Sequence, residues 1–328
     1  MARIRRRQFL AATGALLAPL AALAQIVGRE LRIAFLDDGS EDANRAHFQA
    51  FLKRLGQLGY SEGRNLAVEK RFAQGVTERL PALAAELVAL KPDIIIASAT
   101  PQALAAKRAT STIPIVFMGP TDPVAVGLVQ SLARPGGNAT GISNLAVEVG
   151  VKWIDMMREI IPDAKRLAYL SDTSNKGAAL VFDELQVRAR SLNLSIQFLD
   201  GRQHTRLEHS FETIVRERLD GFIVGAANVV FEHRMAIIEF AARQKLPVIY
   251  GRREYADAGG LLSYGVDVGL NYMRAAEYVH RIAQGAKPMD LPVERPRAVR
   301  LVLNLKAARA QGIAIPQTIR IRADELIE

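Results

Sequence analysis

Asp93-Ile94-Ile95-Ile96-Ala97-Ser98-Ala99-Thr100-Pro101 joins a short apolar run to a group of hydroxyl side chains and a proline. The apolar residues would face both sides of a strand, which is the pattern of a central strand in a parallel sheet covered by helices on both faces. The hydroxyl residues that follow are typical of the start of a helix. The stretch therefore predicts one strand–helix unit of an α/β fold.

The same unit repeats along the chain in two series. The first series includes strands expected at 31–36, 66–72 and 113–117, with amphipathic helices between them. The second series follows Gly150 and is expected to place strands at 166–170, 195–199, 221–224 and 247–250. The segment Ala133-Arg134-Pro135-Gly136-Gly137-Asn138 is the strongest break between the two series. This pattern predicts an α/β protein with two doubly wound parallel-sheet lobes.

The last part of the chain is expected to serve both lobes. After Leu261 the pattern predicts a strand, a helix over residues 271–284 and a strand-rich tail with three prolines. Because this tail is too long for a linker, we expect it to cross back to the first lobe and return to the second. Lobe 1 is then expected to contain residues 25–143 plus about 268–290, and lobe 2 residues 144–267 plus about 291–328.

Residues 1–24 have the features of a cleavable export signal. Four arginines precede an uncharged stretch that ends in the small-x-small pattern Ala22-Leu23-Ala24. Arg6-Arg7-Gln8-Phe9-Leu10 also resembles the twin-arginine consensus. The apolar segment is shorter than the ~20 residues of a membrane span, and no cysteine follows it for lipid attachment. We therefore expect a cleaved signal and a periplasmic protein that is not a lipoprotein.

The net charge of +9 raises the question of nucleic-acid binding. It comes from 43 Lys and Arg against 34 Asp and Glu. Without the four arginines of residues 1–24, 39 basic residues against 34 acidic ones leave +5. The remaining basic residues form no dense stripe, so we expect no contact with nucleic acid.

Motifs for catalysis, cofactors and metals are missing from the sequence. It contains no cysteine, no Gly-x-Gly-x-x-Gly after a strand and no Gly-Lys-Ser/Thr phosphate loop. Gly141-Ile142-Ser143-Asn144-Leu145 lacks the second glycine of a nucleophile elbow. His204 and His209 are five residues apart, which places them on different faces of a helix rather than together on a metal. We expect no enzyme, no cofactor and no metal site.

The loops after the strands are the expected ligand-binding positions, because ligands of open parallel sheets bind at the carboxyl ends of strands. Free amides and the hydroxyls of Ser98 and Thr100 would suit a carboxylate, and Asp122 would suit an ammonium group. Helix capping is the competing interpretation for each of these side chains. The acidic run from Asp37 to Asp42 is interpreted as a solvated turn and cap.

Several motifs resemble those of one protein family. They include Gly59-Tyr60-x-Glu62-Gly63-x-Asn65, Ser111-Thr112-Ile113-Pro114-Ile115-Val116-Phe117 and Leu132-Ala133-Arg134-Pro135-Gly136-Gly137-Asn138. Gly259-Gly260-Leu261-x-Ser263-Tyr264-Gly265 and the end of the chain match the same pattern. The resemblance covers nearly all of the chain after the signal. It is to the substrate-binding proteins of ABC transporters, in the bacterial branch that includes tryptophan- and tyrosine-binding members.

The resemblance implies two lobes of the type I periplasmic-binding-protein kind, joined by three hinge crossovers and closing on a small molecule. It also implies which residues line the cleft between the lobes: Ser98, Ala99, Thr100, Asp122, Ser143, Asn144, Asn228 and Tyr264. A small solute, with an amino acid as the favoured class, is the expected ligand.

We therefore expect a monomeric, periplasmic solute-binding protein that works by hinge closure. Its expected partners are an ABC permease and an ATPase at the inner membrane. Two alternatives stay open at this point. The same fold could serve as a ligand-sensing module for a membrane receptor, or it could carry a hydrolase or transferase.

Overall fold

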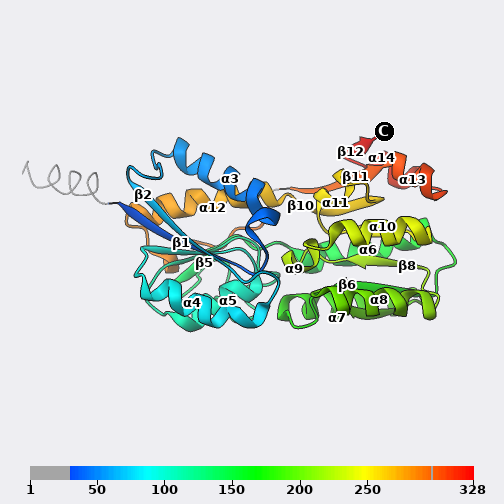
Figure 1. The fold of residues 1–328 in the computed structure, drawn as a ribbon, viewed down its shortest axis with the longest axis horizontal. Helices are drawn as coiled ribbons and strands as arrows, with labels where there is room; N and C mark the ends of the chain where they lie inside the picture. Colours follow the sequence, from blue (N-terminus) through cyan, green and yellow to red (C-terminus); the bar gives the residue numbers. More distant parts are fainter. Residues whose placement is uncertain (1–29, 297) are drawn as a thin grey trace, which may run out of the picture.

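The structure, a computed structural model, describes residues 30–296 and 298–328, and the expected export signal lies outside this range. Two α/β lobes lie end to end along the longest axis of the molecule (Figure 1). Each lobe is built on its own sheet, one of five strands and one of seven. No helix in residues 30–296 and 298–328 is long and apolar enough to cross a membrane.

The sheet of lobe 1 is parallel throughout, in the order β2-β1-β3-β4-β5. Its strands are β1 (Leu31–Asp37), β2 (Leu66–Phe72), β3 (Ile94–Ala97), β4 (Ile115–Phe117) and β5 (Ala139–Gly141). One face carries α3 (Glu41–Gln57) and α12 (Val268–Ala283), and the other carries α4 (Leu80–Ala89), behind the 3-10 turn η1 (Thr77–Arg79), and α5 (Thr100–Ala109).

The apolar run of β3 explains this arrangement. Ile94 and Ile96 pack into the core under α3 and α12, whereas Ile95 and Ala97 pack into the core under α4 and α5. A strand alternates its side chains between the two faces of a sheet, so a central strand needs apolar residues at every position. The sequence prediction of a buried central strand at this place is confirmed.

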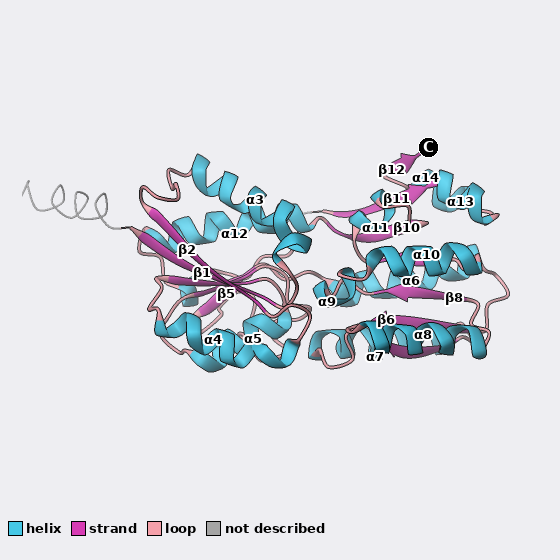
Figure 2. Cartoon of the chain, viewed as in Figure 1, coloured by secondary structure: helices cyan, strands magenta, loops and turns pink. Residues whose placement is uncertain are grey.

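The sheet of lobe 2 has the order β12-β11-β10-β9-β8-β6-β7, and β10 and β11 are its antiparallel pair. Its strands are β6 (Arg166–Ser171), β7 (Ser195–Asp200), β8 (Gly221–Val224), β9 (Val248–Tyr250), β10 (Leu262–Val266), β11 (Val299–Asn304) and β12 (Glu325–Ile327). One face is covered by α6 (Ala146–Ile160), α7 (Lys176–Ser191), α13 (Leu305–Gln311) and α14 (Gln317–Arg322). The other face is covered by α8 (His204–Arg216), α9 (Asn228–Phe231), α10 (Arg234–Gln244) and α11 (Arg253–Asp257). Figure 2 marks the helices and strands of both lobes.

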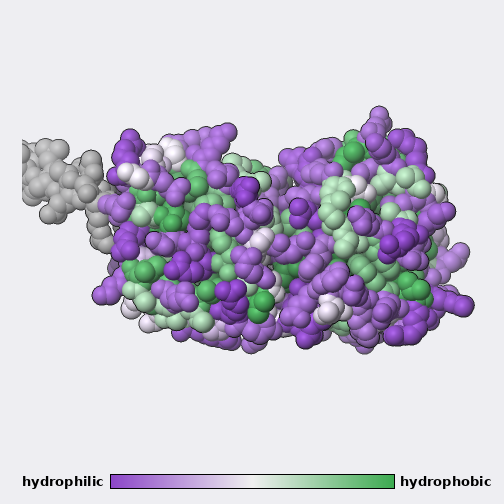
Figure 3. All heavy atoms as spheres, in the orientation of Figure 1, coloured by the Kyte–Doolittle hydropathy of each residue, from purple (hydrophilic) through white to green (hydrophobic). Residues whose placement is uncertain are grey.

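The chain passes between the lobes three times, after β5, after β10 and after Glu294, which follows the short turn η2 (Pro288–Asp290). The first and third passages lie side by side, because Ile142 bridges Glu294 and the Ser143 amide donates to the Glu294 carbonyl. The Asp267 amide donates to the Ala298 carbonyl, which brings the second passage to the same place. In the space-filling view of Figure 3, hydrophilic residues cover much of the surface of both lobes, as expected once the apolar residues of the sheets are buried. The predicted fold class of two lobes with three crossovers is confirmed.

The tail after Glu294 differs from the expectation of a strand-rich segment. Besides β11 and β12 it contains the helices α13 and α14. The side chain of Asn304 caps α13 by accepting from the Ala307 amide, and Gly312 ends the helix in the left-handed conformation, with φ of 71°. These signals for the ends of α13 are local. The sequence pattern did not reveal the helix, because it lies between two strands of the same sheet.

Candidate functional site

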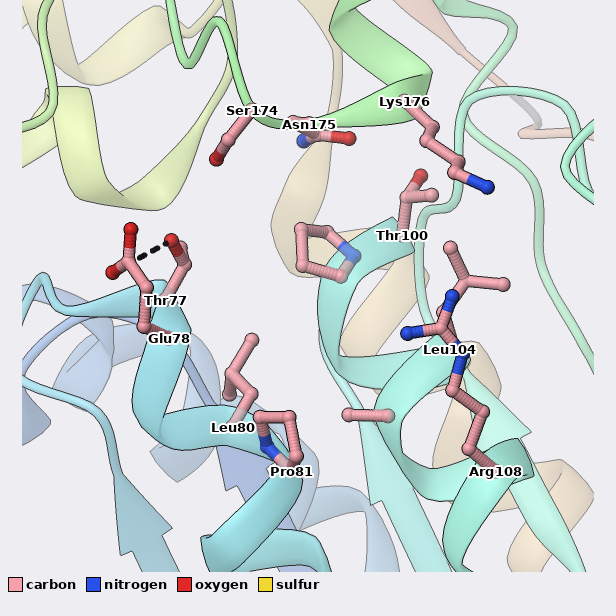
Figure 4. A pocket seen from close by; sticks show the side chains of 12 residues that line it. Thr77, Glu78, Leu80, Pro81, Thr100, Leu104, Arg108, Ser174, Asn175 and Lys176 are labelled. Atoms are coloured by element: carbon pink, nitrogen blue, oxygen red, sulfur yellow. Dashed lines mark hydrogen bonds between the residues drawn. The ribbon is translucent and has the colours of Figure 1, made fainter.

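A cavity of about 250 Å³ lies between the lobes (Figure 4). Lobe 1 contributes the start of α4 and the first turns of α5, with Thr100 and Leu104 among the lining residues. Lobe 2 contributes Ser174, Asn175 and Lys176, at the loop that leads into α7. Figure 4 shows the two walls facing each other across the cavity. The first turn of α5 has no side-chain cap, so its free backbone N–H groups are available to a polar ligand.

Asn228 joins the two lobes through the predicted strand-end loops. From the start of α9 in lobe 2, its Nδ2 lies 3.3 Å from Asp37 Oδ2, 3.1 Å from Asp38 Oδ1 and 3.4 Å from Ser98 Oγ in lobe 1. Its Oδ1 accepts a hydrogen bond from Arg252 at 3.2 Å. The carboxyl ends of β1 and β3 meet at one edge of their sheet, which is why these side chains converge.

Asp37 and Asp38 are buried, with exposed fractions of 0% and 3%. The interpretation of the acidic run as a solvated turn is therefore wrong for these two residues, although it holds for the exposed Glu41 and Asp42 in the first turn of α3. The reason is tertiary: Asp37 ends the buried strand β1, and lobe 2 covers the loop that follows.

The burial of this acidic pair changes its titration. Burial raises the pKa of Asp37 to about 6, although hydrogen bonds from Ser98 and the Gly39 amide oppose the change. Burial, together with the negative charge of Asp37, holds the pKa of Asp38 well above its ordinary value. The donors to these carboxylates are neutral: the Gly39 amide and Asn44 reach Asp37, and Gln102 reaches Asp38.

Arg252 is the one arginine among the largest fully buried side chains of the described residues, with 1% of its surface exposed. It donates to Glu254 at 3.1 Å, lies 3.4 Å from His47 Nε2 in lobe 1, and stacks 3.9 Å over the ring of Phe231. Burial acts to raise the pKa of Glu254, but the charges of Arg252 and His47 outweigh it and hold that pKa well below its ordinary value. Arg252 thus organises the lobe 2 side of the interface.

Two further contacts cross between the lobes. The carboxylate of Glu232 accepts from the Ser40 amide at 2.6 Å and from the Ser40 hydroxyl at 2.9 Å. Arg202 lies 3.4 Å from Glu78 of lobe 1 while it also contacts Asp172 and Asp200 of its own lobe. The lobes of this structure are therefore in direct polar contact around the cavity.

The structure brings three predicted site residues into this interlobe region, namely Ser98, Thr100 and Asn228. Ala99 is the half-buried residue that precedes α5. Ser143 and Asn144 lie on the first crossover, where the Asn144 side chain accepts from the Ala146 amide.

The remaining two predicted residues have other partners. Asp122 Oδ1 accepts from the Val124 and Ala125 amides at 3.0 Å, which is the capping interpretation of this residue. Tyr264 packs against the core of lobe 2, where burial and the nearby Asp324 raise its pKa.

Sequence reasoning missed the importance of Asp37, Asp38, Gln102, Glu232 and Arg252. The position of Asp37 and Asp38 directly after an apolar strand was the available signal. Gln102, inside a predicted helix, and Glu232, beyond Asn228, carried no signal of their own.

Two parallel-sheet lobes, three adjacent crossovers and a cavity that side chains of both lobes line define a two-lobed binding protein of the type I periplasmic-binding-protein kind. The model of the family described as ABC transporter substrate binding protein matches residues 33–327. The chain belongs to this family, and the predicted resemblance is confirmed.

Individual relatives agree with this assignment. The chain is 27% identical over 281 residues to the tyrosine-binding protein of Clostridioides difficile, which covers 84% of this chain and 80% of that protein. The crystal structure of a conserved domain protein from Vibrio cholerae is similar with a TM-score of 0.84 and 30% identity, over 91% of this chain and 100% of that one. The structure of an ABC domain from Streptococcus pneumonia in complex with L-Trp has a TM-score of 0.81 and 22% identity, again over 91% of this chain and 100% of that one. The protein is a substrate-binding protein of an ABC transporter, and its two-lobed fold fits the binding of a small molecule between the lobes.

Proposed function

We propose that this protein is exported to the periplasm, binds a small solute with an amino-acid backbone between its lobes, and delivers it to an ABC permease and its ATPase. The observation that carries this proposal is that polar side chains of both lobes meet at the contact between the lobes, where a cavity lined by both lobes also lies. The pattern of residues 1–24 supports export, and the tyrosine-binding relative supports an amino acid as ligand. We propose that the protein acts as a monomer.

In this proposal the first turn of α5 holds the ligand carboxylate. Ala99 provides no side-chain cap, so the free amides of this turn and the hydroxyls of Ser98 and Thr100 supply donors beside the cavity. Ser143 and Asn144 on the crossover and Asn228 on lobe 2 complete the proposed contacts. We leave out Asp122 and Tyr264, because the first caps a turn and the second packs in the core of lobe 2.

The mechanism follows from the contacts between the lobes. A ligand that touches both lobes favours the closed state only by its greater affinity for that state. The lobes then rotate about the three adjacent crossovers, which are the segments that join them.

The first experiment is native mass spectrometry of the purified protein, which weighs any molecule that copurifies with it. Small-angle scattering then compares the radius of gyration with and without a saturating concentration of each compound that binds. We expect a smaller radius with ligand. A tight ligand that leaves the radius unchanged would contradict hinge closure, and turnover of that ligand would contradict a purely binding role.

A further inference from the structure

Carboxylates gather at part of the contact between the lobes, in a chain whose net charge is +9, whereas Arg108 and Lys176 line the cavity beside it. Arg202 is engaged by Asp172, Asp200 and Glu78, and Arg252 is engaged by Glu254. Both buried or nearly buried arginines of the interface thus already have carboxylate partners.

Asp37 and Asp38 have no such partner. Within the described ranges, 30–296 and 298–328, no cationic side chain forms an ion pair with either of them. Their hydrogen bonds come from neutral groups, chiefly the amides of Asn44, Gln102 and Asn228. Two adjacent buried carboxyl groups that receive hydrogen bonds only from neutral donors have no cation in direct contact, so a cation beside them would be favourable.

A second observation comes from a buried acceptor beside this pair. Gln102 is fully buried, its Nε2 donates to Asp38, and its Oε1 has no hydrogen-bond partner among the described residues. Buried acceptors normally have a donor, so the Gln102 oxygen is an acceptor that a donor group of the ligand would satisfy.

We propose that the ligand presents a primary ammonium group to Asp37 and Asp38 of lobe 1. This inference rests on the proposed function, because it names the charge that the solute carries. An ammonium group has three N–H donors and a positive charge, so it satisfies several acceptors at once and compensates the carboxylates. A hydroxyl group offers one donor and no charge. A metal ion is less suitable, because no group of three or more ligating side chains in the described residues is arranged to hold one.

The acidic pair also lies against lobe 2. Asp37 and Asp38 belong to the loop after β1, and Nδ2 of Asn228 of lobe 2 lies 3.1 Å from Asp38 Oδ1. A ligand whose ammonium group lies at this contact would touch both lobes and so favour the closed state over the open one. The charge of the ligand would then contribute to closure as well as to affinity.

The test is isothermal titration calorimetry with matched probes. The panel contains the twenty amino acids, tyramine, putrescine, 3-(4-hydroxyphenyl)propionate and glucose. Tyramine and putrescine carry an ammonium group without a carboxylate, so they separate a simple amine from an amino acid. The propionate keeps the ring and the carboxylate of tyrosine but lacks its nitrogen.

We expect every ligand that binds to carry an ammonium group, and its deaminated counterpart to bind at least ten-fold more weakly. Asp38→Asn should lower the affinity for the amine ligand at least ten-fold. Asp42→Asn, at an exposed position on α3, should leave this affinity within two-fold of the wild-type value. Thermal unfolding shows whether Asp38→Asn and Asp42→Asn fold. If Asp38→Asn does not fold, Asp37→Asn takes its place in the test.

The outcomes separate this inference from the proposed function. Tight binding of glucose or of the propionate overturns the ammonium site but leaves a solute-binding role intact. If Asp37→Asn and Asp38→Asn both bind an amine ligand with wild-type affinity, the ammonium site is also overturned. Absence of binding across the whole panel, with no copurified molecule, contradicts the proposed amino-acid ligand and the ammonium site together.

Discussion

Glu232 of lobe 2 lies against Ser40 of lobe 1, with its two carboxylate oxygens 2.6 Å from the Ser40 amide nitrogen and 2.9 Å from the Ser40 hydroxyl. Ser40 is the N-cap of α3, a helix of 17 residues. A carboxylate is favourable there, because the first turn of a helix has unpaired N–H groups and the positive end of the helix dipole. Gly39 makes room for this contact, since a Cβ atom at that position would lie 2.7 Å from Glu232 Oε1.

We expect Glu232→Gln to weaken the closed state by about 1–2 kcal/mol, because a charge-assisted hydrogen bond is replaced by a neutral one. Small-angle scattering of the ligand-free variant should show a larger radius of gyration than the wild type. Glu239→Gln, at an exposed position on α10, is the matched control and should change nothing. Equal radii for Glu232→Gln and the wild type would rule out a role of this contact in closure.

Gly177 offers a steric test of closure. A Cβ atom at this position of α7 would lie 2.5 Å from Thr121 Oγ1 and 2.8 Å from Thr100 Oγ1, both in lobe 1. We expect Gly177→Ala to hold the lobes apart and to weaken ligand binding about ten-fold, which corresponds to ~1.4 kcal/mol. Its radius of gyration at ligand saturation should exceed that of the wild type.

Gly56→Ala is the control for Gly177→Ala. Gly56 lies exposed near the end of α3, and a Cβ atom added there would have no neighbouring atom within 4 Å. The substitution should therefore stabilise the protein slightly and leave binding unchanged. A Gly177→Ala variant that binds ligand with wild-type affinity would show that the two lobes do not approach each other this closely in the bound state.

Arg252→Met should destabilise the protein by about 2–3 kcal/mol, because it removes the guanidinium from the partly buried carboxylate of Glu254 and from Asn228 Oδ1. Urea unfolding measures the loss. The neighbouring Arg253 contacts Glu325 and Asp257 at the surface, with 44% of its side chain exposed. Arg253→Met should therefore cost about 1 kcal/mol or less. Similar losses for the two variants would refute the structural role of Arg252.

Asp37→Asn should make the protein less sensitive to pH. The charged groups that act on Asp37 are Asp38 in its own loop, Arg252 and Glu232 of lobe 2, and the ionisable Tyr272 of α12. Because the folded-state pKa of Asp37 is raised to about 6, its contribution to stability is present below pH ~4 and is lost as the pH rises through 6. For this one group the loss between pH 5 and pH 8 is about 1.4 kcal/mol.

Urea unfolding of the ligand-free protein at pH 5 and pH 8 checks this expectation. The wild type should lose more stability than Asp37→Asn over this interval, and Asp42→Asn should behave like the wild type. The pKa of Glu254 lies below the interval, so that residue stays ionised throughout and does not disturb the comparison. Identical pH dependence of the wild type and Asp37→Asn would contradict a raised pKa at this carboxyl.

Much of the fold could be predicted because its signals are local. The alternation of Ile33 and Phe35 with Ala34 and Leu36 between two cores is visible in the sequence, and so is the fully apolar β3. The tail was harder, since α13 and α14 are short and lie between strands of the same sheet. In helices of six or seven residues the apolar periodicity is too brief to read.

The candidate site was predictable only in part. Ser98, Thr100 and Asn228 follow strands or begin helices, so their position at the sheet edge could be inferred. The burial of Asp37 and Asp38 could not, because the side chain that covers them is Asn228, 190 residues further along the chain from Asp38. For Asp122 the local contacts decided the outcome. Its carboxylate accepts from amides two and three residues further along the chain, and these contacts compete with any ligand.

The position of α12 has a consequence for the order in which this protein can be made. Tyr272, Ala275 and Val279 of α12 complete the core of lobe 1, although most of that lobe comes from the first half of the chain. A nascent chain that has just finished β5 can cover that face of its first sheet with α3 alone and still exposes the part that α12 covers later. The sheet of lobe 2 is likewise incomplete until β11 and β12 have been synthesised. Neither lobe is an independent fragment, and both reach their final form only when synthesis is nearly complete.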